Sequence, residues 1–298
     1  MEQHTNRSPN AVPPACPICR GIRPQVRSDW HYICTTCGFE YSSLLPQIET
    51  RTVGLINEVR RQKALEQLRR KNAEQVLDAL AGLRRLVPGS LLDVGSAYGW
   101  FLRVAQERGM EVLGIEPEHA IAAAARASGL TVRDGFFPSA VHPNERFDVI
   151  CFNDVLEHIP NPERIMLASA ERLKPGGLLS VVIPLQTGIF YRTANWLARF
   201  GINGPLDRMW QKSFHSPHLS YFRQAHLEEL ARRAGLQPVL FRTLESVARH
   251  GLWERIRYNR ASNTAISAIY WLALAPSVPV VNHLPADIGH FVFRREGA

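Results

Sequence analysis

The chain has 298 residues, of which 45% are hydrophobic and 21% are charged, a balance typical of globular proteins and unlike that of disordered chains. Its formal net charge of +8 and pI near 9.6 are compatible with an anionic partner such as nucleic acid, a membrane surface or an acidic substrate. Residues 1–15 lack the apolar core of a signal peptide, and no charge-free apolar run of about 18 residues occurs without proline. We therefore expect a cytoplasmic protein with no transmembrane segment.

Four of the five cysteines lie near the N-terminus as two C-x-x-C pairs. The first pair is Cys16 and Cys19, and the second is Cys34 and Cys37. Each pair can fold a tight knuckle, and four thiolates can hold one tetrahedral Zn²⁺ that replaces the core a segment of this size cannot build. A disulfide framework would require an oxidising compartment, so the pattern predicts a structural zinc ribbon over residues 1–50. Such a ribbon could grip a partner or nucleic acid, or only cover one edge of a larger domain.

A long helix is predicted over residues 51–87, between the ribbon and the rest of the chain. Apolar residues recur at approximately helical spacing from Val53 to Val87, and Pro88 and Gly89 end the pattern. Lys and Arg outnumber Asp and Glu in this segment. We interpret the excess as a solvated helix face rather than as a binding stripe.

A glycine-containing turn follows the first apolar strand, 91–94. Gly95 and Gly99 leave the backbone free of Cβ atoms where a ligand must come close, and the amides at the start of the next helix point toward that ligand. The second strand, 111–116, ends in Glu116, where a doubly wound sheet meets ribose hydroxyls. The pattern predicts a turn that cradles a nucleotide, with Glu116 as its ribose ligand.

Strands and helices alternate through the middle of the chain. The predicted order is strand 91–94, helix 99–108, strand 111–116, helix 118–128, strand 130–133, strand 147–152, helix 161–173 and strand 178–183. This alternation predicts a Rossmann-like, doubly wound α/β fold with helices on both faces and ligands at the carboxyl ends of the strands. Two late strands, 239–241 and 290–293, complete the sheet, the last of them antiparallel.

Residues 185–222 interrupt the alternation with an aromatic segment that contains His215 and His218. Long insertions of this kind are typically lids or binding loops, so we predict a lid, followed by a helix over 224–234. The stretch 265–281 is strongly apolar but is broken by prolines, which argues against a membrane span. We interpret it as a helix packed on the lid, with a lipid-facing surface helix as the alternative.

Four motifs follow one another in the middle of the chain, namely LLDVGSAYGWFL, GIEP, FDVICFNDVLEHI and LKPGGLL. In this order they resemble the motifs of the class I S-adenosylmethionine-dependent methyltransferases, over roughly residues 88–184. NAD binding is disfavoured because the turn lacks G-x-G-x-x-G. The resemblance implies a methyltransferase domain over 88–298 and S-adenosyl-L-methionine as its cofactor, although Ala97 stands where the family has its middle glycine. The implied cofactor site consists of Asp93, Gly95, Ala97, Gly99, Glu116, Asp134 and Asn153.

Methyl transfer to an oxygen of high pKa needs a base nearby, and the candidates are His158, His215 and His218. Each could instead support the structure, His158 by capping the cofactor pocket and the other two by bonding to lid backbone. Asp154, Glu157 and His158 resemble the acidic-x-x-Glu-His pattern of ubiquinone-pathway O-methyltransferases, where it implies a divalent ion. Because the pattern also occurs in relatives that look metal-free, we expect no catalytic metal.

Three functions compete. The first is S-adenosylmethionine-dependent methyl transfer, at oxygen, to a small-molecule, sugar or lipid-linked acceptor, with peripheral membrane contact as an option. The second is a ribosomal RNA methyltransferase whose ribbon grips RNA, because a ribbon that begins Cys-Pro-Ile-Cys is similar to that of some ribosomal RNA guanine methyltransferases. The run from Asn153 to Leu156 departs from the N-P-P-Y type of base methylases, which makes nucleic acid the less favoured partner. The third, a non-catalytic cofactor-binding scaffold, is disfavoured by the intact Asp93 and Glu116.

Overall fold

The protein is described here by a computed structural model. It describes residues 15–46, 58–212, 214–247, 252–257, 264–276, 278–281 and 283–296. The start of the predicted ribbon, 1–14, and the start of the predicted connecting helix, 51–57, lie outside the described residues.

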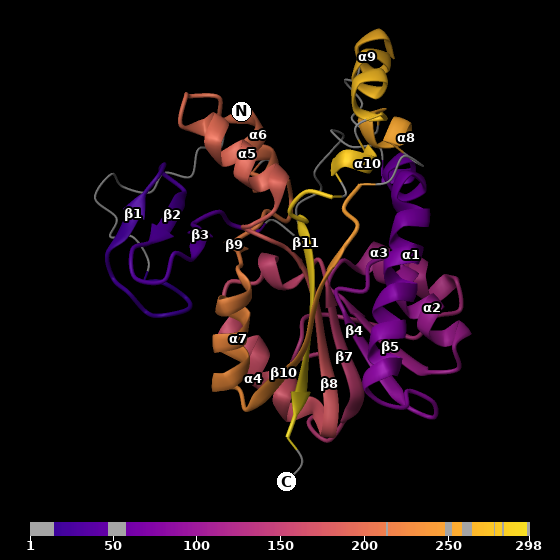
Figure 1. Ribbon diagram of the computed structural model, residues 1–298. Helices are drawn as coiled ribbons and strands as arrows, with labels where there is room; N and C mark the ends of the chain where they lie inside the picture. The colour runs from indigo at the N-terminus through magenta and orange to yellow at the C-terminus, as the bar shows by residue number, and fades with distance from the viewer. Residues whose placement is uncertain are drawn as a thin grey trace.

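A seven-stranded sheet forms the centre of the described chain (Figure 1). From edge to edge its strands are β10 (Leu236–Leu244), β11 (Ile288–Arg295), β8 (Leu173–Pro184), β7 (Phe147–Asn153), β4 (Ser90–Val94), β5 (Glu111–Glu116) and β6 (Val132–Asp134). Neighbouring strands run parallel, except that β11 is antiparallel to both β8 and β10. The predicted Rossmann-like α/β fold with an antiparallel last strand is therefore confirmed.

The start of β8 differs from the prediction. The strand begins at Leu173 rather than at residue 178, because Leu173 already pairs with Phe147 of β7 on the far side of a register shift. The prediction leaves residues 174–177 between the helix and the strand. The structure instead passes directly from helix to strand, so these residues belong to β8.

Helices cover both faces of the sheet. They are α1 (Glu58–Leu83), α2 (Trp100–Glu107), α3 (His119–Ala127), α4 (Pro162–Arg172) and α7 (Gln224–Arg233). Helices α1, α2 and α3 lie on one face, and α4 and α7 lie on the other (Figure 1). Successive strand residues alternate between the two faces. Leu91 packs with α1 and α2, whereas Leu92 joins the cluster that contains α4 and α7.

The N-terminal ribbon is joined to the larger domain through a shared sheet. Its strands β1 (Pro24–Val26), β2 (His31–Cys34) and β3 (Glu40–Ser42) are antiparallel, and β3 also pairs with β9 (Ser220–Tyr221) from the predicted lid. Phe39 is fully buried in a hydrophobic cluster that also contains Phe222 and Leu227. The ribbon is thus packed against β9 and α7 and is not merely tethered to the larger domain by α1.

The predicted lid, 185–222, contains two helices before β9. These are α5 (Ile189–Ala198), which buries Tyr191 and Ala194, and α6 (Gly204–Met209), which buries Leu206. Tyr191 of α5 and Trp210, which follows α6, form a buried cluster with Trp30 of the ribbon. The aromatic composition of the segment is therefore explained in part by a local core.

A second projection lies at the same end of the molecule as α5 and α6 (Figure 1). It consists of α8 (Leu252–Arg257), α9 (Thr264–Leu274) and α10 (Val278–Val281). The apolar stretch 265–281 thus divides into two helices, and α9 packs against α8. None of the helices that the structure describes is long and apolar enough to cross a membrane.

Candidate functional site

The glycine turn after β4 has the backbone that the sequence predicts. Gly95 and Gly99 both lie in the left-handed region, with φ of +71° and +79°, which favours glycine. A Cβ at Gly95 would come within 2.6 Å of Val155, and one at Gly99 within 2.1 Å of Leu130. Ala97 also has a positive φ, +46°. Its N–H donates to Glu116 Oε2 at 2.9 Å, a bond that holds the alanine in this conformation.

Two buried carboxylates lie beside this turn. Glu116 also accepts a bond from the N–H of Glu118 at 2.9 Å, and burial raises its pKa. Asp93 accepts a bond from Asn153 Nδ2 at 3.0 Å. Burial raises the pKa of Asp93 to about 7, against the effect of the Asn153 bond and with a smaller rise from the Glu116 charge. Paired buried acids of this kind suit a cationic ligand that carries hydroxyl groups.

The turn and both carboxylates line a cavity of about 1590 Å³ at the carboxyl ends of the strands. Here the strand order reverses between β4 and β7, the position at which open α/β sheets bind ligands. Asp134 does not line this cavity. Its carboxylate pairs with His119 at 3.3 Å and Arg126 at 3.1 Å, while the following Gly135 and Phe136 do line it. The structure thus places Gly135 and Phe136, rather than the Asp134 side chain, at the wall of the cavity.

The turn after β7 forms the opposite wall of the cavity. Glu157, which is 1% exposed, has no hydrogen-bond partner for either carboxylate oxygen among the described residues. Burial raises the pKa of Glu157 well above its usual value, and Asp154 adds to the rise. His158 Nδ1 lies 2.9 Å from the carbonyl oxygen of Pro217, which can only accept. In neutral His158 the proton is therefore on Nδ1, and Nε2, 4.0 Å from Glu157 Oε1, is the basic nitrogen.

The other two histidines have different surroundings. His218 is buried, its Nε2 lies 2.8 Å from Gln211 Nε2, and its Nδ1 lies 3.3 Å from the hydroxyl of Tyr221. Both ring nitrogens are thus used inside the protein, and burial holds the pKa of His218 well below its usual value. His215 is partly exposed and its Nε2 lies 3.1 Å from Glu118 Oε1, so it bridges the lid to the segment that follows β5.

Glu157, His158 and His218 also place one potential ligand atom each within 4.8 Å of the others. The sequence motif contains Glu157 and His158, but His218 arrives from the lid and could not be predicted from the motif. A cation bound by these three groups would compete with the Gln211 or Tyr221 bond of His218. The arrangement is thus better explained as a histidine pair, with ring centroids 4.7 Å apart, than as a preformed metal centre.

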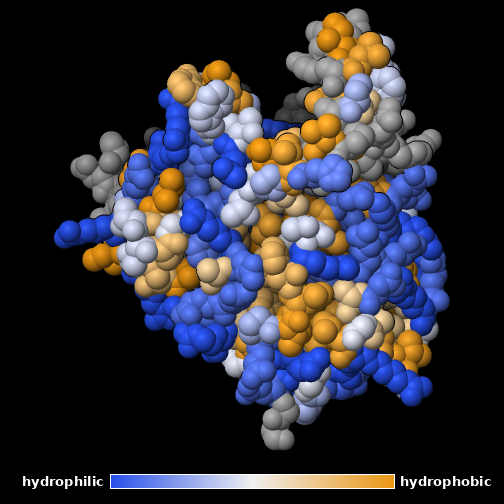
Figure 2. All heavy atoms as spheres, viewed as in Figure 1, coloured by the Kyte–Doolittle hydropathy of each residue, from blue (hydrophilic) through white to orange (hydrophobic). Residues whose placement is uncertain are grey.

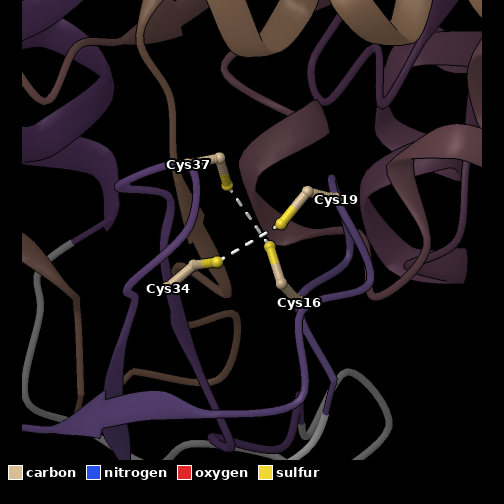
Figure 3. A group of neighbouring side chains, drawn as sticks. All are labelled: Cys16, Cys19, Cys34 and Cys37. Atoms are coloured by element: carbon tan, nitrogen blue, oxygen red, sulfur yellow. Dashed lines mark hydrogen bonds between the residues drawn. The ribbon is translucent and has the colours of Figure 1, made fainter.

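The four ribbon cysteines converge on one point, as Figure 3 shows. The Sγ atoms of Cys16 and Cys37 are 3.6 Å apart, and those of Cys19 and Cys34 are 3.3 Å apart. A tetrahedral ion with Zn–S bonds of about 2.3 Å requires sulfur atoms about 3.8 Å apart. The cysteines are free thiols with no disulfide among them, so the donor set and spacing fit Zn²⁺.

Four aromatic residues of the ribbon are core residues and offer no exposed ring for stacking on nucleic acid bases. They are Trp30, Tyr32, Phe39 and Tyr41, and all are buried. The lid supplies cavity residues that sequence reasoning missed, above all Tyr191, Met209 and Tyr221. Their only signal in the sequence is the aromatic character of the predicted lid.

A comparison with known proteins identifies a protein family whose model matches this chain. Residues 64–240 match the family described as "Methyltransferase domain". The chain is 33% identical over 159 residues to a ubiquinone biosynthesis O-methyltransferase of Cereibacter sphaeroides, which covers 50% of this chain and 60% of the relative. It is 30% identical over 176 residues to the ubiquinone biosynthesis O-methyltransferase of an Azoarcus species, covering 55% of this chain and 70% of the relative. The chain thus spans about 60% of the length of the first relative.

Among solved structures, the cyclopropane synthase MmaA2 of Mycobacterium tuberculosis is similar in fold. The TM-score is 0.56 with 18% sequence identity, and the similarity covers 84% of this chain and 88% of the synthase. The ribbon precedes the family match, which begins at residue 64.

Proposed function

The chain belongs to the methyltransferase domain family, and on that premise we propose that it transfers a methyl group from S-adenosyl-L-methionine to an oxygen of a small-molecule acceptor. The observation that carries the proposal is that one cavity joins the turn with its two buried acids to His158. A cofactor held by the turn and an acceptor beside His158 would then share a single cavity. The similarity to two ubiquinone biosynthesis O-methyltransferases supports oxygen as the methylated atom.

The proposed cofactor contacts follow from the chemistry of each group. The Glu116 carboxylate, already oriented by the N–H groups of Ala97 and Glu118, accepts bonds from the ribose hydroxyls. Asp93, supported by Asn153, faces the cationic methionine end, whose charge favours the ionised carboxylate. When bound, the cofactor supplies an electrophilic methyl group on a positively charged sulfur.

His158 is the proposed general base. Its Nε2 would take the proton of the acceptor hydroxyl as that oxygen is methylated, and bound S-adenosyl-L-methionine would supply the electrophilic methyl group. The new positive charge on the imidazole would lie 4.0 Å from Glu157 Oε1, where it would favour the ionised form of this buried carboxyl group. His218 positions the His158 ring, and His215 with Glu118 closes the lid over the cofactor side.

We propose that Cys16, Cys19, Cys34 and Cys37 hold one structural Zn²⁺. The support is the convergence of the four sulfur atoms. An ion at this position would fix both knuckles.

We further propose that the acceptor is amphiphilic or lipid-linked and is met at a membrane surface. Residues at the base of each helical projection line the cavity. They are Tyr191 and Met209 on one side and residues 244–247 on the other. Apolar residues gather at the outer ends of both projections, as Figure 2 shows over α5 and α6 and over α9. The exposed residues are Trp196, Phe200, Ile202, Ile269, Trp271, Leu272 and Leu274. The segment 189–212 carries four Lys and Arg residues and one acid, which suits anionic headgroups.

A transfer assay tests the function. Purified protein is incubated with methyl-labelled S-adenosylmethionine and with phenols and catechols that carry or lack a prenyl tail, and labelled ether product is extracted. We expect label on the tailed catechols, and binding of S-adenosylmethionine by calorimetry. A protein that binds no S-adenosylmethionine contradicts the proposal. Binding without transfer to any class of acceptor would favour the scaffold hypothesis, and label in bulk ribosomal RNA with a steep salt dependence would favour the RNA hypothesis.

A further inference from the structure

The ribbon reaches the acceptor side of the cavity through backbone pairing. In the β3–β9 pair, Glu40 lies opposite Tyr221 and Tyr41 opposite Ser220. Ser42 extends the contact, since its N–H donates to the carbonyl of Leu219 at 2.9 Å and its Oγ donates to the carbonyl of His218 at 3.1 Å. The ribbon therefore holds the end of the lid in register.

The same lid residues hold the catalytic turn. The N–H of Leu219 donates to the carbonyl of Glu157 at 2.7 Å, and the carbonyl of Pro217 fixes the His158 ring at 2.9 Å. Ribbon strand, lid strand and base are consequently linked by consecutive hydrogen bonds. A shift of β3 would move the group that sets the tautomer of His158.

A buried carboxylate reinforces this link. Glu40 of β3 is 5% exposed and accepts bonds from three elements: His31 Nε2 at 2.8 Å in the ribbon, the Tyr191 hydroxyl at 2.5 Å in α5, and the Gln186 side-chain amide after β8. The Tyr191 ring stacks on Tyr221 with centroids 4.0 Å apart. Glu40 thus joins the ribbon to two aromatic residues that line the acceptor cavity.

The second knuckle is bonded to the methyltransferase domain at its own backbone. The carbonyl of Cys37 lies 3.0 Å from His226 Nε2, and the carbonyl of Gly38 accepts a bond from Gln186 Nε2 at 3.1 Å. These carbonyls immediately precede β3. An ion on Cys34 and Cys37 would therefore fix the conformation from which Glu40 emerges.

We propose that the metal-loaded ribbon is part of the acceptor site, and that Glu40 is the positioning residue through which it holds Tyr191 and β9 over His158. The inference rests on the proposed function for what the cavity binds. The hydrogen bonds between the ribbon and the lid can be tested without measuring turnover. Ribbon contacts elsewhere do not have this role. Arg233 donates to the carbonyl of Ile18 at 2.7 Å and Arg20 pairs with Glu163 at 3.2 Å, on the outer side of α4 and α7.

Hydrogen–deuterium exchange of the full chain tests this link without any acceptor. Zinc content is first measured by elemental analysis, with one ion per chain expected. The zinc-loaded protein is then compared with protein stripped by a chelator and with Glu40→Gln. We expect amide exchange at least about tenfold faster in 186–191 and 218–222 for both, because the opening free energy falls when these bonds are lost. Peptides covering 91–97 and the affinity for S-adenosylmethionine should stay within about twofold.

Two further variants distinguish positioning of the lid by Glu40 from a general loss of stability. Tyr191→Phe removes one Glu40 bond but keeps the ring stack, so it should deprotect 186–191 and 218–222 while the ribbon keeps its zinc and its protection. Glu163→Gln, which removes the outer ion pairs, should leave the lid peptides unchanged. Faster exchange confined to 15–46 after zinc removal, or equal effects of Glu163→Gln and Glu40→Gln, would overturn the inference. A chain purified without metal would overturn the role of zinc. Failure to bind S-adenosylmethionine would overturn the proposed function alone.

Discussion

At the scale of single residues, the three candidate histidines look alike in sequence and differ in structure. Their protonation states depend on groups that are distant in the chain, such as the Pro217 carbonyl beside His158 Nδ1. Both ring nitrogens of His218 form hydrogen bonds inside the protein, one with Gln211 and one with Tyr221. No local pattern encodes these partners, so the sequence predicts the set of histidines but not the base among them.

Replacing His158 should therefore have the largest kinetic effect of the three. We expect His158→Ala to lower kcat by roughly 10²–10⁴-fold, the usual contribution of a general base, with little change in affinity for S-adenosylmethionine. His215→Ala, which breaks the bridge to Glu118, should act mainly on cofactor affinity. Steady-state kinetics with the acceptor found in the transfer assay measure both. If His158→Ala stays within about twofold of wild type in kcat, the base is elsewhere.

Asp93 should make cofactor binding depend on pH. Its pKa of about 7 lies above its ordinary value of 3.8, so between these pH values the folded protein holds a proton that the unfolded chain has lost. The contribution of Asp93 to stability therefore falls as pH rises through this window. A cationic ligand prefers the ionised form, so binding near neutrality releases a proton and tightens as pH rises from about 6 to 8.

Calorimetry in buffers of different ionisation enthalpy measures that released proton directly. The dissociation constant for S-adenosylmethionine should fall by up to about tenfold per pH unit below the pKa. Asp93→Asn should bind more weakly and without this pH dependence. A wild-type dissociation constant that is flat over the same range would show that Asp93 does not face the charge.

At the scale of elements, the sequence predicts the elements formed within one continuous segment but not the pairing of β3 with β9. The β4 strand, the glycine turn and α2 lie in one continuous segment, so their chemistry is local and their positions agree with prediction. The β3–β9 pair joins Glu40 to Tyr221 through a strand of two residues. So short a strand carries no alternation of its own. Its partner is decided by the burial of Phe39 against Phe222, which only the folded chain reveals.

The glycine turn allows a matched test of backbone against packing. Gly99 and Gly129 both have positive φ, +79° and +87°, but a Cβ would meet Leu130 at 2.1 Å in the first case and open space in the second. Gly129→Ala should cost about 1–2 kcal/mol of unfolding free energy from backbone strain alone. Gly99→Ala should cost more and should also weaken cofactor binding. Chemical denaturation and calorimetry of both variants check this; equal losses of stability would mean that Leu130 yields without cost.

At the scale of the whole molecule, two helical projections flank one cavity. One is formed by α5 and α6 and the other by α8, α9 and α10, and both lie at the carboxyl end of the central strands (Figure 1). The sequence predicts an apolar stretch at 265–281 but leaves its surroundings open between lid packing and lipid contact. Exposed Ile269 and Leu272 on α9 agree with the lipid-facing alternative, since large apolar side chains clustered in the open usually mark an interaction surface.

The exposed apolar residues of the two projections, which we call the apolar tips, should bind lipid vesicles. We expect the protein to sediment with vesicles that contain anionic phospholipid more than with neutral ones, because Lys and Arg near an anionic surface contribute about 1 kcal/mol each. The double variants Trp196→Ser with Phe200→Ser and Ile269→Ser with Leu272→Ser each remove apolar area worth about 1.5–3 kcal/mol per fully buried side chain. Each pair should lower the vesicle-bound fraction by at least about tenfold in partition coefficient.

Leu167→Ser provides the matched control, because Leu167 is 44% exposed on α4, away from both projections (Figure 1). This variant should sediment with vesicles as wild type does, and all variants should bind S-adenosylmethionine with unchanged affinity. If the tip variants and Leu167→Ser behave alike, the apolar tips do not meet lipid. If wild type stays in solution with every vesicle composition while it still methylates a soluble catechol, the acceptor is not delivered from a membrane, and the two projections serve only to enclose it.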